Sequence, residues 1–188
     1  MTTRDEIITA LLCLGEEKGL TNVSLADIAD EVGIRKASIY SHFSSQSQMI
    51  EQAISYCRNL LRNSSFSVDF KAKDAKTLLT SLFDSIISTF AERPVSSFFS
   101  VVRQMYMFDR SFAEENRQIE SMISTRVRIA LEFCVQRSWL DIRDTDYAAD
   151  LVTAAVIRNI CDVLSSDAGW ETDNLADNLL ALFGQSIP

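Results

Sequence analysis

A cluster of cationic and hydrogen-bonding side chains lies near the N-terminus. Its members are Arg35, Lys36, Ser38, Tyr40, Ser41 and His42. Cationic groups attract phosphates, and hydroxyl groups bond to phosphate oxygens or to base edges. Ile39 and Phe43 lie four residues apart, so they share the opposite, apolar face of a short helix. The pattern favours contact with a nucleic acid, while a solvated polar face on a small helical domain is the alternative.

A second predicted helix precedes this short one and supplies its packing surface. Ser24 and Asp27 form a helix-start signal, and apolar residues recur at helical spacing across residues 25–32. Gly33 stands where a left-handed residue ends such a helix. Two helices joined by a tight turn, the second with a polar outer face, form a helix-turn-helix. In that motif the second helix enters the major groove of DNA.

Further residues complete a recognisable pattern. The matching positions are Gly19, Ser24, Ile28-Ala29, Gly33-Ile34, Lys36-Ala37-Ser38-Ile39-Tyr40, His42-Phe43, Ser45 and Met49. This spacing, over residues 20–50, resembles the N-terminal DNA-binding domain of the TetR family of bacterial transcriptional regulators. The resemblance covers about a quarter of the chain, and the remainder is similar to the family only in length and all-helical pattern.

The resemblance implies DNA contacts at the positions of Ser24, Lys36, Ala37, Tyr40, Ser41 and His42. With the cluster above, the expected DNA-binding residues are Ser24, Arg35, Lys36, Ala37, Ser38, Tyr40, Ser41 and His42. The chain departs from the family pattern at two positions. Arg35 stands where Ser or Thr usually caps the second helix of the motif, and Gln46 stands where Lys usually reaches a phosphate.

The charge of the chain opposes DNA binding in general. The formal net charge is −8, and residues 1–50 carry four basic and seven acidic side chains. Phosphate neutralisation normally dominates affinity for DNA. We therefore expect affinity to come from a small, focused patch and to depend strongly on salt.

Composition limits the other classes of function. No run of about 18 apolar residues predicts a membrane span, and the N-terminus has no apolar signal-peptide core, so we expect a cytoplasmic protein. Four cysteines show no C-x-x-C pairing, and His42 is the single histidine, which disfavours a metal site. We find no phosphate-binding glycine loop or nucleophile motif. The sequence predicts neither an enzyme nor a bound cofactor.

Helical periodicity extends over most of the chain, which has only two prolines and five glycines. We expect an all-α protein with an N-terminal three-helix DNA-binding domain and a larger helical effector-binding and dimerisation domain. The expected helices cover about 3–18, 25–32, 37–43, 46–62, 74–92, 94–108, 111–138, 145–165 and 172–183. Ser45 and Ser111 are the expected caps of the fourth and seventh helices. The domain boundary is placed within the fourth helix, giving domains 1–50 and 51–188.

The eighth expected helix is apolar over much of its circumference, so it must bury two faces. The resemblance implies a homodimer through the last two helices, from Thr145 to Phe183, and two recognition helices on a palindromic operator in double-stranded DNA. The alternative is that the eighth helix is the central core helix of a monomer.

Aromatic residues are concentrated between Phe83 and Phe112, where seven of the 17 in the chain lie. An aromatic wall between helices is typical of an apolar ligand pocket, although a plain helical core has the same composition. The expected lining residues are Phe83, Ile87, Phe90, Phe98, Phe99, Val102, Met105, Tyr106, Met122, Ile123 and Arg126. Arg126 would meet an anionic group of the ligand, or alternatively form a surface ion pair.

These observations predict a transcriptional repressor that a small apolar or amphipathic effector releases from DNA by shifting the fourth helix. The alternative function is a helical ligand-binding or protein-interaction module without DNA-binding activity.

Overall fold

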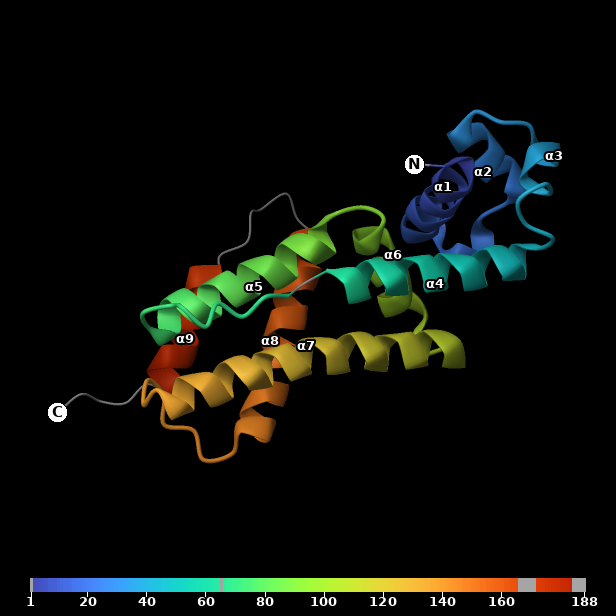
Figure 1. Cartoon of the computed structure of the whole chain (residues 1–188). Helices are drawn as coiled ribbons and strands as arrows, with labels where there is room; N and C mark the ends of the chain where they lie inside the picture. Colours follow the sequence, from blue (N-terminus) through green and yellow to red (C-terminus); the bar gives the residue numbers. More distant parts are fainter. Residues whose placement is uncertain (1, 65, 166–171, 184–188) are drawn as a thin grey trace. The chain divides into compact units, whose positions relative to one another are not determined.

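The computed structural model describes residues 2–64, 66–165 and 172–183, and within these ranges it contains helices and no extended strand (Figure 1). The elements are α1 (Thr3–Lys18), a 3-10 turn η1 (Leu20–Asn22), α2 (Leu25–Val32), α3 (Lys36–Ile39), α4 (Gln46–Asn63), α5 (Ala75–Ala91), α6 (Val95–Met105), α7 (Arg110–Gln136), α8 (Thr145–Ser165) and α9 (Thr172–Phe183). The all-α class predicted from the sequence is confirmed.

Local signals place the ends of the first two helices. Thr2 and Asp5 form a capping box at the start of α1, and Gly19 ends it with φ +84°. Ser24 and Asp27 form a second capping box, and α2 ends at Gly33 in the left-handed region with φ +72°. A side chain other than glycine pays a conformational penalty in that region, which is why Gly33 suits the turn.

Three other helix ends differ from the expectations. Helix α3 is four residues long, because the chain turns at Tyr40 and the N–H groups of His42 and Phe43 both donate to the Ile39 carbonyl. Helix α6 ends at Met105 rather than near 108. Asp109, not Ser111, caps α7: its carboxylate accepts from the Ser111 N–H at 2.8 Å and from the Ser111 hydroxyl at 2.6 Å.

The chain divides into two compact units. The first contains the N-terminal residues to Ser64 together with residues 92–113. Helix α1 is its centre and packs on α2, α4 and α6, while α3 packs on α2. Its fully buried side chains include Ile7, Leu11, Ile28, Ile39, Phe43, Met49, Phe98 and Phe99. The helix-turn-helix therefore shares a core with α6, which follows it by more than fifty residues in the sequence.

The second unit contains residues 65–91 and those from 114 onward. Helix α5 packs on α8 and α9, and Phe66 stacks on Phe90 with 6.1 Å between ring centroids.

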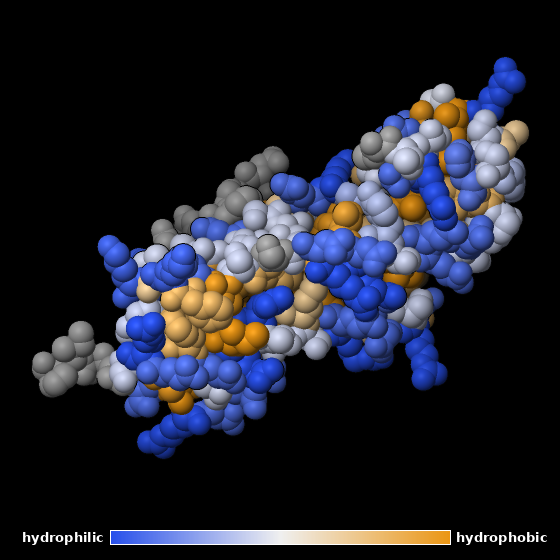
Figure 2. Space-filling view, viewed as in Figure 1, coloured by the Kyte–Doolittle hydropathy of each residue, from blue (hydrophilic) through white to orange (hydrophobic). Residues whose placement is uncertain are grey.

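Polar side chains cover much of the molecular face in Figure 2, where apolar colour appears in a few places. The large apolar side chains that are exposed are Tyr40, Phe70, Met107, Phe108, Tyr147, Leu151 and Leu182.

Cys13, Cys57 and Cys134 are buried and free, and Cys161 is half-buried. Burial raises the pKa of Cys57 to about 12 and that of Cys134 to about 11. Both thiols are therefore protonated at neutral pH and are poor nucleophiles. Among the residues that the structure describes, no cluster of His, Cys, Asp and Glu side chains could hold a metal ion, and no helix is long and apolar enough to cross a membrane.

Candidate nucleic-acid interface

Most of the predicted recognition residues in and around α3 are exposed. Ile39 and Phe43 are 1% and 2% exposed, so they anchor α3 and the following turn in the core of the first unit. Tyr40, between them, is 56% exposed. The side chains of Arg35, Lys36, Ala37, Ser41 and His42 are also exposed, and Ser38 is half-buried. The apolar and polar faces therefore separate as the sequence predicted.

The turn after α3 determines how Ser41 can act. Its hydroxyl donates to the Ser38 carbonyl at 2.6 Å, and its N–H donates to the same carbonyl at 3.2 Å. A hydroxyl has one hydrogen to donate and two lone pairs. In this arrangement Ser41 is therefore suited to accept a hydrogen bond from a base amino group rather than to donate one to a phosphate.

Ser24 lies at the start of α2 in a tightly bonded cap. Its hydroxyl accepts from the Asp27 N–H at 3.2 Å, and its N–H donates to the Asp27 carboxylate at 2.7 Å. Lys18 forms an ion pair with Asp27 at 2.7 Å. The hydrogen bonds from Lys18 and Ser24 hold the pKa of Asp27 well below its usual range.

The two departures from the family pattern have different structural consequences. Arg35 is the N-cap residue of α3 and makes no side-chain capping bond, so this position carries a cation in place of a cap. Gln46 is half-buried, and its amide donates to the Val23 carbonyl at 2.9 Å. Gln46 thus faces inward, whereas Arg35 remains exposed.

Sequence reasoning missed the contacts that Arg4 makes with Phe43 and Gln52. Its guanidinium lies 5.6 Å from the centroid of the Phe43 ring and donates to the Gln52 side chain, with a 3.0 Å bond from Nε. Arg4 therefore links α1, α4 and the turn after α3. In the sequence Arg4 can be identified only as a cation near the start of α1, and no pattern there indicates its partners.

Residues 7–53 match the model of the family described as bacterial regulatory proteins, tetR family. The N-terminal domain belongs to the tetR family. This match covers α1 to the middle of α4 and confirms the resemblance stated from the sequence. TetR-family regulators are DNA-binding proteins without enzymatic activity, which agrees with the expected absence of catalysis.

The curated relatives match about a third of this chain. The chain is 42% identical over 60 residues to the biofilm operon icaADBC HTH-type negative transcriptional regulator IcaR of Staphylococcus aureus, covering 32% of each protein. It is 34% identical over 73 residues to IcaR of Staphylococcus epidermidis, covering 35% of this chain and 40% of that protein. The match thus spans about a third of the length of these relatives.

Several solved structures share the fold over nearly the whole chain. A TetR-family regulator from Agrobacterium tumefaciens has a TM-score of 0.71 at 20% identity, covering 97% of this chain and 98% of that one. A putative transcriptional regulator from Saccharomonospora viridis, solved with choline, has a TM-score of 0.71 at 17% identity, covering 97% of both chains. NemR of Escherichia coli, in its reduced form, has a TM-score of 0.70 at 12% identity over the full length of both chains.

The residues expected to line an effector pocket lie in both compact units. Phe98, Phe99, Val102, Met105 and Tyr106 belong to the first unit. The second unit contains Phe83, Ile87, Phe90, Met122, Ile123 and Arg126. Most of these side chains are buried, while Arg126 is exposed. Their role in binding a ligand stays a prediction.

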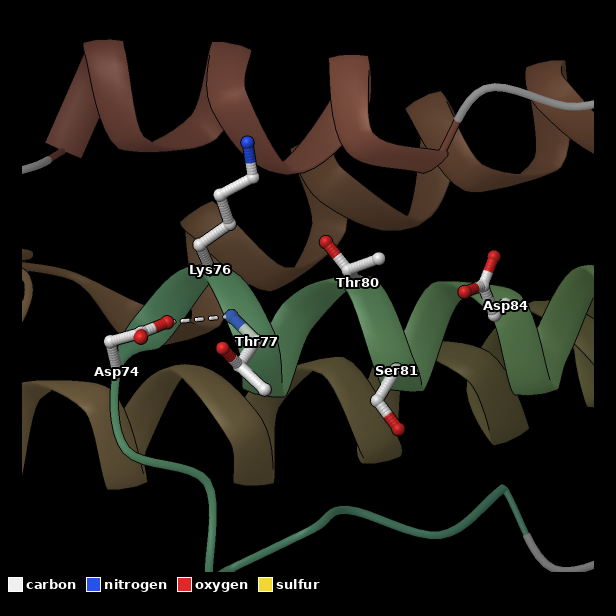
Figure 3. A pocket seen from close by; sticks show the side chains of 6 residues that line it. All are labelled: Asp74, Lys76, Thr77, Thr80, Ser81 and Asp84. Atoms are coloured by element: carbon white, nitrogen blue, oxygen red, sulfur yellow. Dashed lines mark hydrogen bonds between the residues drawn. The ribbon is translucent and has the colours of Figure 1, made fainter.

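A surface pocket of different character runs along α5. Its lining residues are Asp74, Lys76, Thr77, Thr80, Ser81 and Asp84. Asp74 accepts from the Thr77 N–H at 2.8 Å, as Figure 3 shows, and so caps α5. Lys76 forms an ion pair with Asp177 of α9 at 2.7 Å. Each of these lining residues has a polar or charged side chain, and none of them is among the residues predicted to bind an apolar effector.

Proposed function

We propose that this chain is a transcriptional repressor that binds a palindromic operator as a homodimer and is released by a small apolar or amphipathic effector. The observation that carries the proposal is the exposed polar face of α3, from Arg35 to His42, held by Ile39 and Phe43 in the core. A helix presented in this way fits the major groove. The 42% identity over 60 residues to a negative transcriptional regulator also supports the proposal.

The charge of this face supports specific rather than general attraction to DNA. Arg35 and Lys36 are exposed beside the hydroxyl-bearing side chains. Lys18 is paired with Asp27, and Asp30 and Glu31 are exposed on α2. Since acidic groups surround a small cationic patch, non-specific binding is weak and the correct base contacts must supply much of the affinity.

Exposed apolar side chains on the last two helices support the homodimer. Tyr147 and Leu151 of α8 are 64% and 49% exposed, and Leu182 of α9 is 76% exposed. Tyr147 and Leu151 lie four residues apart, so they share one face of α8. Burial of this face by a second copy would remove it from water. Two recognition helices related by two-fold symmetry would then read two half-sites.

The effector proposal rests on the aromatic and methionine-rich segment from Phe83 to Ile123. A ligand that binds only one arrangement of the helices shifts the equilibrium by its differential affinity, and a few kcal/mol is sufficient for control. We place the change of state in α4, because this helix belongs to the same unit as α3 and continues to Asn63.

The deciding experiment is selection of the purified chain on a randomised DNA duplex library at low salt, followed by sequencing. An enriched palindrome supports the repressor, and the steep loss of its binding with rising salt follows from phosphate neutralisation. The absence of any enriched sequence at low salt contradicts the proposal and favours a helical module without DNA-binding activity. The selected duplex then provides the assay for effectors, which are the compounds that weaken its binding.

A further inference from the structure

Gln46 occupies the first position of α4 and reaches across to the chain that enters α2. Its amide Nε2 donates to the Val23 carbonyl at 2.9 Å, across 23 residues of sequence. Val23 is 3% exposed and directly precedes Ser24, the N-cap of α2. The contact therefore fixes the position of the α2 start relative to the α4 start.

The start of α4 has its own independent bonds. Ser45 is the N-cap and accepts from the Gln48 N–H at 3.1 Å. The Gln48 side chain accepts from the Ser44 N–H at 2.7 Å. Since Gln46 is not needed for either bond, its amide is free to serve the contact with Val23. Farther along α4, Gln52 accepts from Arg4, which also stacks on Phe43. Gln46 and Gln52 thus connect the first half of α4 to the residue before α2 and to α1.

We propose that Gln46 is a positioning residue for DNA binding, which acts by holding Ser24 and the start of α2 at the correct place rather than by contacting a phosphate itself. This inference rests on the proposed function, since it requires that the chain binds a DNA duplex. Gln46 is neutral and half-buried, and in this proposal it orients the start of α2, which contacts DNA.

The test is a double-mutant cycle with Gln46→Met and Ser24→Gly, measured on the selected duplex. Methionine keeps the length of the side chain and removes the donor. Glycine removes the Ser24 hydroxyl and remains an acceptable N-cap. We expect Gln46→Met to weaken binding about 2- to 10-fold, the range of one net hydrogen bond, with an unchanged salt dependence. In the Ser24→Gly background the same change should have a clearly smaller effect.

Gln118→Met is the matched control, because Gln118 is an exposed residue of α7 that bonds only within its own helix, to Glu114. It should leave affinity unchanged. The proposal is wrong if Gln46→Met binds like the parent chain, or if its loss is equally large in both backgrounds, since the latter indicates an independent contact with DNA. Failure of the parent chain to bind any duplex contradicts the proposed function instead.

A measurement on the unsubstituted chain covers the case in which Gln46→Met does not fold. By NMR, the side-chain amide of Gln46 should exchange slowly with solvent in both the free and the DNA-bound protein, because the bond to Val23 persists. An amide that exchanges rapidly in the free protein and becomes protected only on DNA would overturn the proposal, since that behaviour belongs to a direct phosphate contact.

Discussion

Arg35 combines two roles that favour different side chains. As the N-cap of α3 it leaves the capping position without a side-chain acceptor, and as an exposed cation it faces the expected position of DNA. Arg35→Ser supplies the hydroxyl that an N-cap prefers. We expect the free energy of unfolding to rise by about 1 kcal/mol and the affinity for the operator to fall. Urea unfolding and DNA titration measure the two effects, and a variant that gains both stability and affinity contradicts this assignment of Arg35.

Tyr40 is the most specific test of the recognition face. The ring is 56% exposed while its neighbour Ile39 is 1% exposed, so its removal leaves the core unchanged. We expect Tyr40→Ala to abolish selective binding and to preserve helicity by circular dichroism and the oligomeric state. Phe108→Ala is the control for the loss of an aromatic surface residue, because Phe108 is 85% exposed and lies outside the recognition face and the proposed dimer face.

Asp27 makes the helix-turn-helix sensitive to acid. Hydrogen bonds from Lys18 and Ser24 lower its pKa from the ordinary value of 3.8. A carboxylate with a lowered folded-state pKa stabilises the fold fully above its unfolded-state pKa, and this contribution is lost as the pH falls through the folded-state value. We expect Asp27→Asn to be less stable than the parent chain at pH 7 and the difference to shrink below about pH 4. Urea unfolding across this range would refute the prediction if the difference were constant.

At the scale of elements, α1 packs closely on α6 and on the turn η1 at Gly15. A Cβ added at Gly15 would lie 3.0 Å from Leu20 Cδ1 and 3.3 Å from Val101 Cγ2. Polar contacts cross the same interface, where the Ser97 hydroxyl donates to the Glu16 carboxylate at 2.7 Å and the Gln104 amide donates to the Glu16 carbonyl at 3.0 Å. The helix-turn-helix is therefore attached to α6 as well as to α4, and a change in α6 would be transmitted through α1.

This close packing gives a prediction for Gly15→Val. The branched side chain cannot be accommodated without displacing the side chains of Leu20 and Val101, so we expect the free energy of unfolding to fall by about 1–3 kcal/mol, as in other overpacked cores. Glu17→Val, on the exposed side of the same helix, separates this effect from the lower helix propensity of valine. Equal losses in the two variants would show that packing at Gly15 is not limiting.

The accuracy of the sequence predictions depended on whether the signals were local. The spans of α1, α8 and α9 were predicted correctly because long apolar periodicity and nearby caps determine them. Helix α3 is shorter than expected, since the following turn is held by bonds to Ser38 and Ile39 that periodicity does not reveal. The recognition face was predicted because it depends on one short helix. The contacts of Gln46 and Arg4 join residues 23 and 48 positions away, so tertiary structure alone reveals them.

At the scale of the whole molecule, a net charge of −8 makes a single recognition face a weak binder. Each face exposes Arg35 and Lys36 beside acidic residues of α2. For duplex DNA the slope of log affinity against log salt is about −0.9 for each phosphate neutralised. Two cations therefore predict a slope of about −2 for one copy and about −3.5 for a dimer with both faces bound. In the proposed dimer, the second copy would therefore contribute both the second half-site and half of the electrostatic attraction.

Leu151→Glu tests this connection between assembly and DNA binding. Leu151 is 49% exposed on α8 and lies on the face proposed to join two copies, and a buried carboxylate without a partner is strongly disfavoured in such an interface. We expect a monomer by analytical ultracentrifugation, with weaker operator binding and a salt slope reduced from about −3.5 to about −2. Asp150→Ala, on the neighbouring exposed position, should leave the assembly intact. A Leu151→Glu dimer with the full slope would place the interface elsewhere. A monomer that keeps the full slope would instead show that one chain carries phosphate contacts beyond Arg35 and Lys36.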